Sequence, residues 1–199
     1  MQLIPLQLRQ NRLYIFDLHK NSYKKVYVLS NEVSEQLCSF FQENNAPYYA
    51  NVIMDDLLII YYEDTENPVY NDIVASLKSS LYRNYVKRPL PKNQEVVYFM
   101  LIEETEKMQR MYQALLESEL GSKLKILCYE SDDYKGYSYM KVYNHNARKE
   151  NMLDYLQAEI GCEKIITYGT IPEQYTYLIG PQEENRLVHK IKKEFEPLL

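Results

Sequence analysis

One stretch of the chain, EVVYFMLIEE at residues 95–104, is apolar almost without interruption. Such a run is typical of an interior strand, whose side chains are buried on both faces of a sheet. It is followed by apolar residues on one helical stripe, which include Met108, Met111 and Leu115. This part of the sequence therefore predicts a sheet layered with helices.

Periodicity divides the rest of the chain into short strands and amphipathic helices. Further strands are predicted at residues 13–18, 24–30, 48–54, 57–62, 124–130, 137–144 and 164–169. Helices are predicted from Ser30 or Asn31 to about Asn45, from Pro68 through Tyr85, from Met108 to a stop at Gly121, from Asn146 to Ile160 and from Glu183 to Phe195. The alternation predicts a mixed α/β fold.

The order of these elements predicts three segments. Residues 1–29 supply leading strands, and residues 30–143 form an α/β domain in which a sheet has helices on one face. Residues 144–199 change to a helix, strand, helix order, which is typical of the edge of an open, mostly parallel sheet.

Composition excludes several classes of protein. Of 199 residues, 26% are charged, and the 23 Lys and Arg against 28 Asp and Glu give a net charge of -5, so no basic field for nucleic acid is expected. No apolar window is long enough to span a membrane and the start is unlike a signal peptide, so a cytoplasmic protein is expected. The 21 Tyr and absent Trp are interpreted as sheet surface.

Cysteines and histidines show no metal-binding spacing. The odd number and wide separation of the cysteines predict reduced, mostly buried thiols at Cys38, Cys128 and Cys162. The histidines are equally scattered and are interpreted as surface or loop residues: His19, His145 and His189. No cofactor is expected.

The C-terminal part carries a recognisable pattern. Lys149 near a helix start is followed by Leu153 and Leu156 one and two turns on, and then by a hydrophobic strand that ends at Tyr168-Gly169. This resembles the C-terminal part of the haloacid dehalogenase (HAD) superfamily in its Cof-type branch of metabolite phosphatases. Residues 5–17 resemble the segment before the large cap of that branch, and the order of the intervening elements is that of such caps.

The resemblance implies a HAD-like cap plus a truncated, Rossmann-like core remnant. Lys149 matches the lysine that steadies the transferred phosphoryl group, where a cation is needed because charge accumulates on its oxygens; a solvated surface lysine is the other interpretation. Thr170 and Gln174 occupy the positions of magnesium-binding aspartates, and a neutral hydroxyl and amide bind a hard dication poorly. Glu173 is a candidate substitute ligand.

The family's nucleophile motif lies well before the cap, whereas this chain begins almost where the cap does. An alternative alignment takes residues 13–22 as the nucleophile strand, with Asp17 as the nucleophile, His19 as the acid and magnesium as cofactor. The other interpretation of Asp17 is that it begins a hairpin turn.

Three functions follow from the resemblance. The chain is expected to be a catalytically inactive binding or regulatory protein, or one half of a split phosphatase; the alternative is an active phosphatase of small phosphorylated metabolites that uses Asp17. Expected partners are a second copy or a chain that supplies the missing core half, and a small phosphorylated ligand. The helix predicted from Asn146 to Ile160 carries an apolar stripe, made by Met152, Leu153, Leu156 and Ile160. Self-association is expected because a small core remnant would cover this stripe only partly.

Overall fold

The computed structural model describes residues 6–9, 14–17, 20–77, 84–161, 165, 168–169 and 176–178. Its helices are α1 (Asn31–Glu43), α2 (Pro68–Leu77), α3 (Thr105–Glu117) and α4 (Lys149–Ile160), with a 3-10 turn at Gly121–Lys123. Its strands are β1 (Leu6–Arg9), β2 (Tyr14–Asp17), β3 (Ser22–Val26), β4 (Tyr48–Met54), β5 (Leu57–Tyr62), β6 (Asn84–Lys87), β7 (Tyr98–Glu104), β8 (Leu124–Glu130), β9 (Tyr137–Asn144), β10 (Tyr168–Gly169) and β11 (Tyr177–Leu178).

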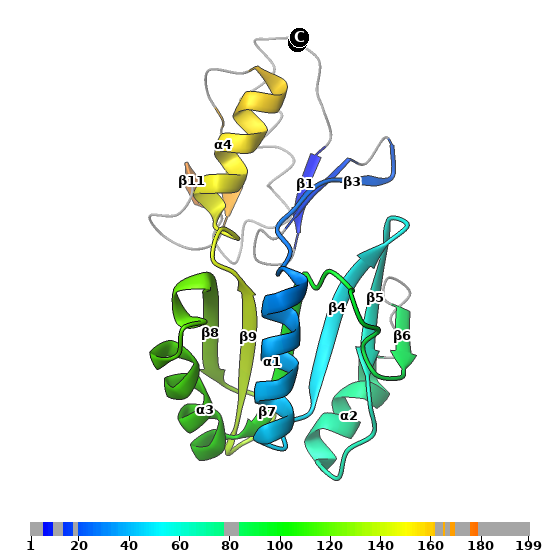
Figure 1. Cartoon of the computed structure of the whole chain (residues 1–199). Coiled ribbons are helices and arrows are strands. Elements are labelled where there is room, and N and C mark those ends of the chain that lie inside the picture. Colours follow the sequence, from blue (N-terminus) through cyan, green and yellow to red (C-terminus); the bar gives the residue numbers. More distant parts are fainter. Residues whose placement is uncertain are drawn as a thin grey trace. The chain divides into compact units, whose positions relative to one another are not determined.

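A six-stranded sheet in the order β6-β5-β4-β7-β9-β8 forms the main layer (Figure 1). All neighbours are antiparallel except β5 and β6, which are parallel. Strand β7 is interior, and five of its seven residues are buried. The interior strand predicted from the apolar run is therefore confirmed.

Helices α1 and α3 cover one face of this sheet. Ser30 caps α1 by accepting a hydrogen bond from the Val33 amide at 3.3 Å, as the sequence predicts. Apolar residues of both helices pack on alternate residues of the strands, because successive strand residues point to opposite faces. The cluster includes Val33, Leu37, Phe41, Ala50, Val52, Phe99, Leu101, Met108, Met111, Leu115, Met140 and Val142.

Helix α2 packs on the opposite face. Its buried residues Tyr70, Ile73 and Val74 contact residues such as Tyr49 and Ile102, which alternate with those under α1 and α3. The expectation of helices on one face therefore holds for α1 and α3 but not for α2.

Tight turns fix the local geometry where the sequence predicts hairpins. Strands β4 and β5 are joined at Asp55 and Asp56, both with positive φ (50° and 58°), the backbone that a two-residue hairpin turn of this hand requires. The Asp56 carboxylate also accepts a hydrogen bond from the Tyr23 amide at 2.7 Å, which ties β3 to this turn.

The structure differs from the predicted elements at β6, for a clear physical reason, and at β1. Tyr85 continues the helical spacing of the preceding segment, but it lies in β6, and its prediction as helix is wrong. Residues of β6 pair with Ile59–Tyr62 of β5, and Tyr85 contacts the ring of Tyr62, so tertiary pairing overrides the local pattern. In addition, β1 precedes the predicted hairpin of β2 and β3, and the three form a small antiparallel sheet.

The chain forms two compact units. One comprises residues 5–152, which include the predicted domain 30–143, and the other takes in residues from Leu153 onward. In the second unit, β10 and β11 are parallel neighbours. Met152 is fully buried, whereas Leu153, Leu156 and Ile160 are half-buried. The helix predicted at 183–195 lies outside the described residues.

Candidate functional site

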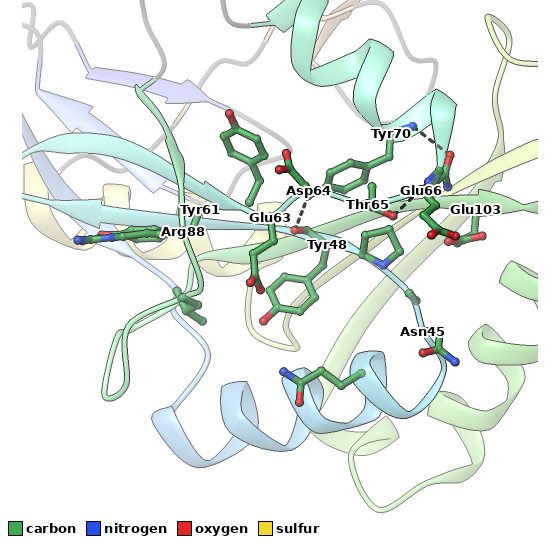
Figure 2. A pocket seen from close by; sticks show the side chains of 16 residues that line it. Asn45, Tyr48, Tyr61, Glu63, Asp64, Thr65, Glu66, Tyr70, Arg88 and Glu103 are labelled. Atoms are coloured by element: carbon green, nitrogen blue, oxygen red, sulfur yellow. Dashed lines mark hydrogen bonds between the residues drawn. The ribbon is translucent and has the colours of Figure 1, made fainter.

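A cavity of about 530 Å³ lies where several elements of the sheet domain end (Figure 2). We call it the Glu63 pocket. It is formed by the end of α1, the starts of β4 and α2, the ends of β5 and β7, and the residues after β6. Its lining comprises Gln42, Asn45, Ala46, Pro47, Tyr48, Tyr61, Tyr62, Glu63, Asp64, Thr65, Glu66, Asn67, Tyr70, Arg88, Leu90 and Glu103.

The loop 63–67 is held in place by Asn67. Its side-chain oxygen accepts hydrogen bonds from the Val69 and Tyr70 amides at 3.0 and 3.1 Å and so caps α2. Its side-chain amide donates to the Ile102 carbonyl at 3.1 Å, which anchors the loop to β7. The loop therefore presents its acidic residues from a fixed backbone.

Stacked tyrosines form the floor beneath this loop. The rings of Tyr49 and Tyr70 stack at 4.1 Å, and the Tyr49 hydroxyl donates to the Tyr70 carbonyl at 2.7 Å. The Tyr70 hydroxyl in turn donates to the Tyr48 carbonyl at 2.8 Å. Burial raises the pKa of all three phenols well above the ordinary value, so they remain neutral donors.

Acidic groups dominate the charge of the pocket. The Asp64 carboxylate pairs with Lys87 at 2.6 Å, and the buried Glu103 pairs with Lys107 at 3.2 Å. No such partner is found for Glu63 or Glu66 within the described part of the chain.

Arg88 is the single cation in the lining. Its guanidinium lies 5.2 Å from the centre of the Tyr61 ring and donates to the Tyr61 hydroxyl at 3.3 Å. Glu63 and Glu66, the two carboxylates without a lysine partner, outnumber this one guanidinium, so the net charge of the pocket is negative and favours cationic ligands.

The residues singled out from the sequence lie elsewhere. Lys149 is the first residue of α4 and only 9% exposed, so its interpretation as a solvated lysine is wrong. It follows the end of β9, whereas the pocket lies beside the start of β9, where Ser138 pairs with Glu103.

Asp17 ends β2 in an antiparallel sheet, paired with Leu6 and Ser22. A hairpin turn at residues 20–21 follows, as the turn interpretation of Asp17 predicts. The remaining predicted positions lie outside the described residues: His19, Thr170, Glu173 and Gln174.

The residues of the Glu63 pocket were not predicted from the sequence to be functional. One available signal was the acidic segment EDTEN at 63–67, which joins a buried strand to a helix, a place where functional residues gather. Within the described ranges, no three His, Cys, Asp or Glu side chains are grouped to hold a metal ion. Nor does any described helix have the length and apolarity needed to cross a membrane.

The chain is similar to known proteins in its structure. No family model and no curated protein matches the chain. A haloacid dehalogenase-like hydrolase from Bacteroides thetaiotaomicron matches with a TM-score of 0.59 and 18% identity, over 82% of this chain and 59% of that one. The chain thus spans about three fifths of that structure's length.

Two further structures match over more of their length. A protein from Eubacterium rectale gives a TM-score of 0.65 at 13% identity, over 96% of this chain and 76% of that one. A phosphatase of the HAD enzyme superfamily from Bacteroides thetaiotaomicron gives 0.58 at 12% identity, over 94% and 72%. The chain therefore has the fold of HAD-like hydrolases, which confirms the resemblance at the level of the fold and the mixed α/β fold class.

Proposed function

We propose that this chain is a HAD-like protein of the Cof type that acts by binding a small molecule, and that it does not hydrolyse phosphate esters on its own. The Glu63 pocket is the proposed site, and a cationic or neutral polar molecule is the proposed ligand. The observation that carries the proposal is the charge of the pocket. Of the four carboxylates in its lining, those of Glu63 and Glu66 have no lysine partner among the described residues, and the lining holds one guanidinium.

Charge decides between binding and phosphoryl transfer at this site. A phosphoryl group in its transition state needs cations and hydrogen-bond donors around its oxygens. The carboxylates of Glu63 and Glu66 repel such a group, whereas they attract an ammonium group and accept hydrogen bonds from hydroxyls. The pocket therefore suits a ligand without phosphate.

Magnesium does not fit the residues of this chain that match the family's metal loop. Thr170 and Gln174 offer a hydroxyl and an amide where a hard dication prefers anionic oxygens. The free carboxylates of the Glu63 pocket do not group in threes with other acidic residues in the described ranges. The proposed binding function therefore does not depend on a metal ion.

Binding is tested by calorimetry with n-butylamine, glucose and glucose 6-phosphate as probes. We expect n-butylamine or glucose to bind, and we expect Glu63→Gln to weaken binding. Glu119→Gln is a matched control, because Glu119 is exposed and lies outside the pocket lining. Binding that survives Glu63→Gln unchanged would place the ligand elsewhere.

The catalytic alternative has a separate test. We expect no hydrolysis of p-nitrophenyl phosphate above background in the presence of magnesium. Turnover that disappears in Asp17→Asn would contradict the proposal and favour the active phosphatase, with Asp17 as nucleophile, His19 as acid and Lys149 as the phosphoryl-binding cation.

A second candidate is a split phosphatase in which a partner chain supplies the nucleophile. The half-buried apolar residues of α4 favour such a partner, because further burial of apolar surface stabilises a complex: Leu153, Leu156 and Ile160. We propose that the chain associates with itself or with such a partner, and that light scattering gives a mass above 23.8 kDa. A monomeric mass at all concentrations, and in mixtures with candidate partners, would contradict this association.

A further inference from the structure

Strand β8 forms one edge of the six-stranded sheet (Figure 1). Its seven residues pair with β9 in one unbroken register. Edge strands are usually kept from pairing with other chains by prolines, bulges or lysines at the edge. The sequence LKILCYE has no proline, and its one lysine, Lys125, is turned toward β9, because its amine donates to the Ala147 carbonyl at 2.7 Å and lies 5.8 Å from the centre of the Tyr143 ring. Strand β8 is therefore an unprotected edge.

The hydrogen bonds between β8 and β9 fix which backbone groups point outward. The Ser131 amide donates to the opposite Tyr137 carbonyl at 2.9 Å, and the His145 amide donates to the opposite Lys123 carbonyl at 3.1 Å. Because bonded pairs alternate along an antiparallel ladder, odd-numbered residues of β8 bond to β9 and even-numbered residues present their N–H and C=O groups outward. The Leu124 amide donates to the Gly121 carbonyl, and no described residue forms a hydrogen bond to the outward groups at 126, 128 and 130.

The charges at the two ends of β8 are complementary to each other. Lys123 precedes the strand, is exposed and forms no ion pair within the described part of the chain. The other end carries exposed Glu130, Asp132 and Asp133 against one exposed cation, Lys135. A second β8 that runs antiparallel places the basic start of each strand beside the acidic end of the other, whereas a parallel copy places like charges together. The edge is therefore complementary to an antiparallel copy of itself.

Exposed apolar side chains lie beside this edge on both faces of the sheet. On one face, Gln109 of α3 donates to the Cys128 sulfur at 3.8 Å, so this side of α3 lies over β8. Leu116 follows on the same side of the helix two turns later and is 44% exposed. On the other face, Tyr129 of β8 is 42% exposed. A strand added to this edge would cover apolar surface on both faces.

We propose that two copies of this chain pair through their β8 strands, antiparallel and around a twofold axis at Leu127. This register joins the outward groups of residue 126 to those of 128 and lets all seven residues of each strand pair. Each Lys123 then lies opposite Ser131 of the other copy, between Glu130 and Asp132. The pairing goes beyond the ligand binding proposed for the Glu63 pocket, and it gives the self-association proposed above a defined surface.

Helix α3 leaves room for this pairing. It contacts β7, β9 and β8 and so lies over β9, the middle strand of the three. Three strand spacings of roughly 4.8 Å place the α3 helices of the two copies about 14 Å apart. Helices in direct contact are about 8–10 Å apart, so the remaining space accommodates side chains such as Leu116.

Disulfide trapping in the full chain tests the register. Leu127→Cys is made in a chain whose native cysteines, Cys38, Cys128 and Cys162, are replaced by alanine. In a non-hydrogen-bonded pair the two Cα atoms lie about 4.5 Å apart, which suits a disulfide, so we expect a covalent dimer on mild oxidation. Leu57→Cys is the matched control, because Leu57 is 55% exposed at the turn between β4 and β5, and we expect it to stay monomeric.

Exchange of charges tests the orientation. By light scattering we expect a mass of twice 23.8 kDa, and we expect Lys123→Glu to weaken the dimer about tenfold, because like charges then meet at both ends of the pair. Adding Glu130→Lys to Lys123→Glu is expected to restore the dimer. The two positions are about 23 Å apart along one strand, so a contact within one chain cannot explain the recovery. Lys92→Glu makes the same charge change at an exposed position away from β8 and should have no effect.

The outcomes separate this pairing from the proposed function. A monomeric mass at all concentrations, or no recovery on charge exchange, overturns it. A larger mass without a Leu127→Cys cross-link also overturns the β8 interface, although it keeps an association through another surface. Binding of n-butylamine or glucose that depends on Glu63 is measured on the same samples, so failure of the Glu63 pocket as a site is recognised independently of the dimer.

Discussion

Replacing Ser34 by alanine is expected to stabilise the free protein. The Ser34 hydroxyl is buried without a partner, and such a group costs about 1–3 kcal/mol of desolvation in the folded state. Alanine removes that cost and also has a higher helix propensity by roughly half a kcal/mol. Part of this gain is offset by the small void that the oxygen leaves, so we expect a net increase of about 1–2 kcal/mol in the free energy of unfolding.

The assay is thermal unfolding followed by circular dichroism, with tyrosine fluorescence as a second probe. For a domain of about 150 residues, each kcal/mol shifts the midpoint by roughly 2–4 °C, so a rise of about 2–8 °C is expected. Ser138→Ala is the control, because the Ser138 hydroxyl is equally buried but lies 3.0 Å from the Thr105 hydroxyl as a hydrogen-bond partner. This variant should lose about 1–2 kcal/mol.

A lower midpoint in both variants would refute this explanation of the Ser34 hydroxyl. Ser34 would then have a hydrogen-bond partner in solution, such as an ordered water.

Other predictions concern buried phenols and glycines. Alkaline pH should destabilise the fold, because the pKa values of three buried phenols are higher in the folded than in the unfolded chain: Tyr48, Tyr49 and Tyr70. The stability that these neutral phenols contribute is full below about pH 10 and is lost as the pH rises further. Absorbance at 295 nm reports their ionisation, and circular dichroism reports unfolding. Phenolate absorbance that rises fully before any unfolding would contradict it. Gly136→Ala should cost about 1 kcal/mol in denaturant titrations, because its φ of 83° is strained for alanine although no atom lies within 4 Å of the new Cβ. Gly121→Ala should cost more, because its Cβ would meet a backbone carbonyl oxygen of α3, and equal costs would argue against the steric explanation.

Much of the sheet could be predicted because its signals are local. The strands 124–130 and 137–144 match β8 and β9 in both bounds, and Ser30 caps α1 as predicted. Strand β6 could not be predicted, because its four residues lie at the edge of the sheet and only the pairing with β5 makes them extended.

The Glu63 pocket could not be predicted for a related reason. Its walls combine Tyr48, Glu63 and Arg88, which are far apart in sequence and come together only through the pairing of β4, β5 and β6. Each of them has an ordinary role in a strand or loop when considered alone. The missing hydrogen-bond partner of Ser34 is likewise a property of the packed structure, and no sequence pattern encodes it.

A hydrogen bond between Asn144 and Val28 holds together the two ends of the six-stranded domain. The Asn144 side-chain amide donates to the Val28 carbonyl at 2.7 Å, although the residues are 116 positions apart. The chain therefore enters and leaves the six-stranded domain at one point, the arrangement that allows a domain to be inserted into a host loop or circularly permuted. New termini opened at the exposed segment 92–93, with a short linker joining residues 28 and 144, should preserve the sheet order.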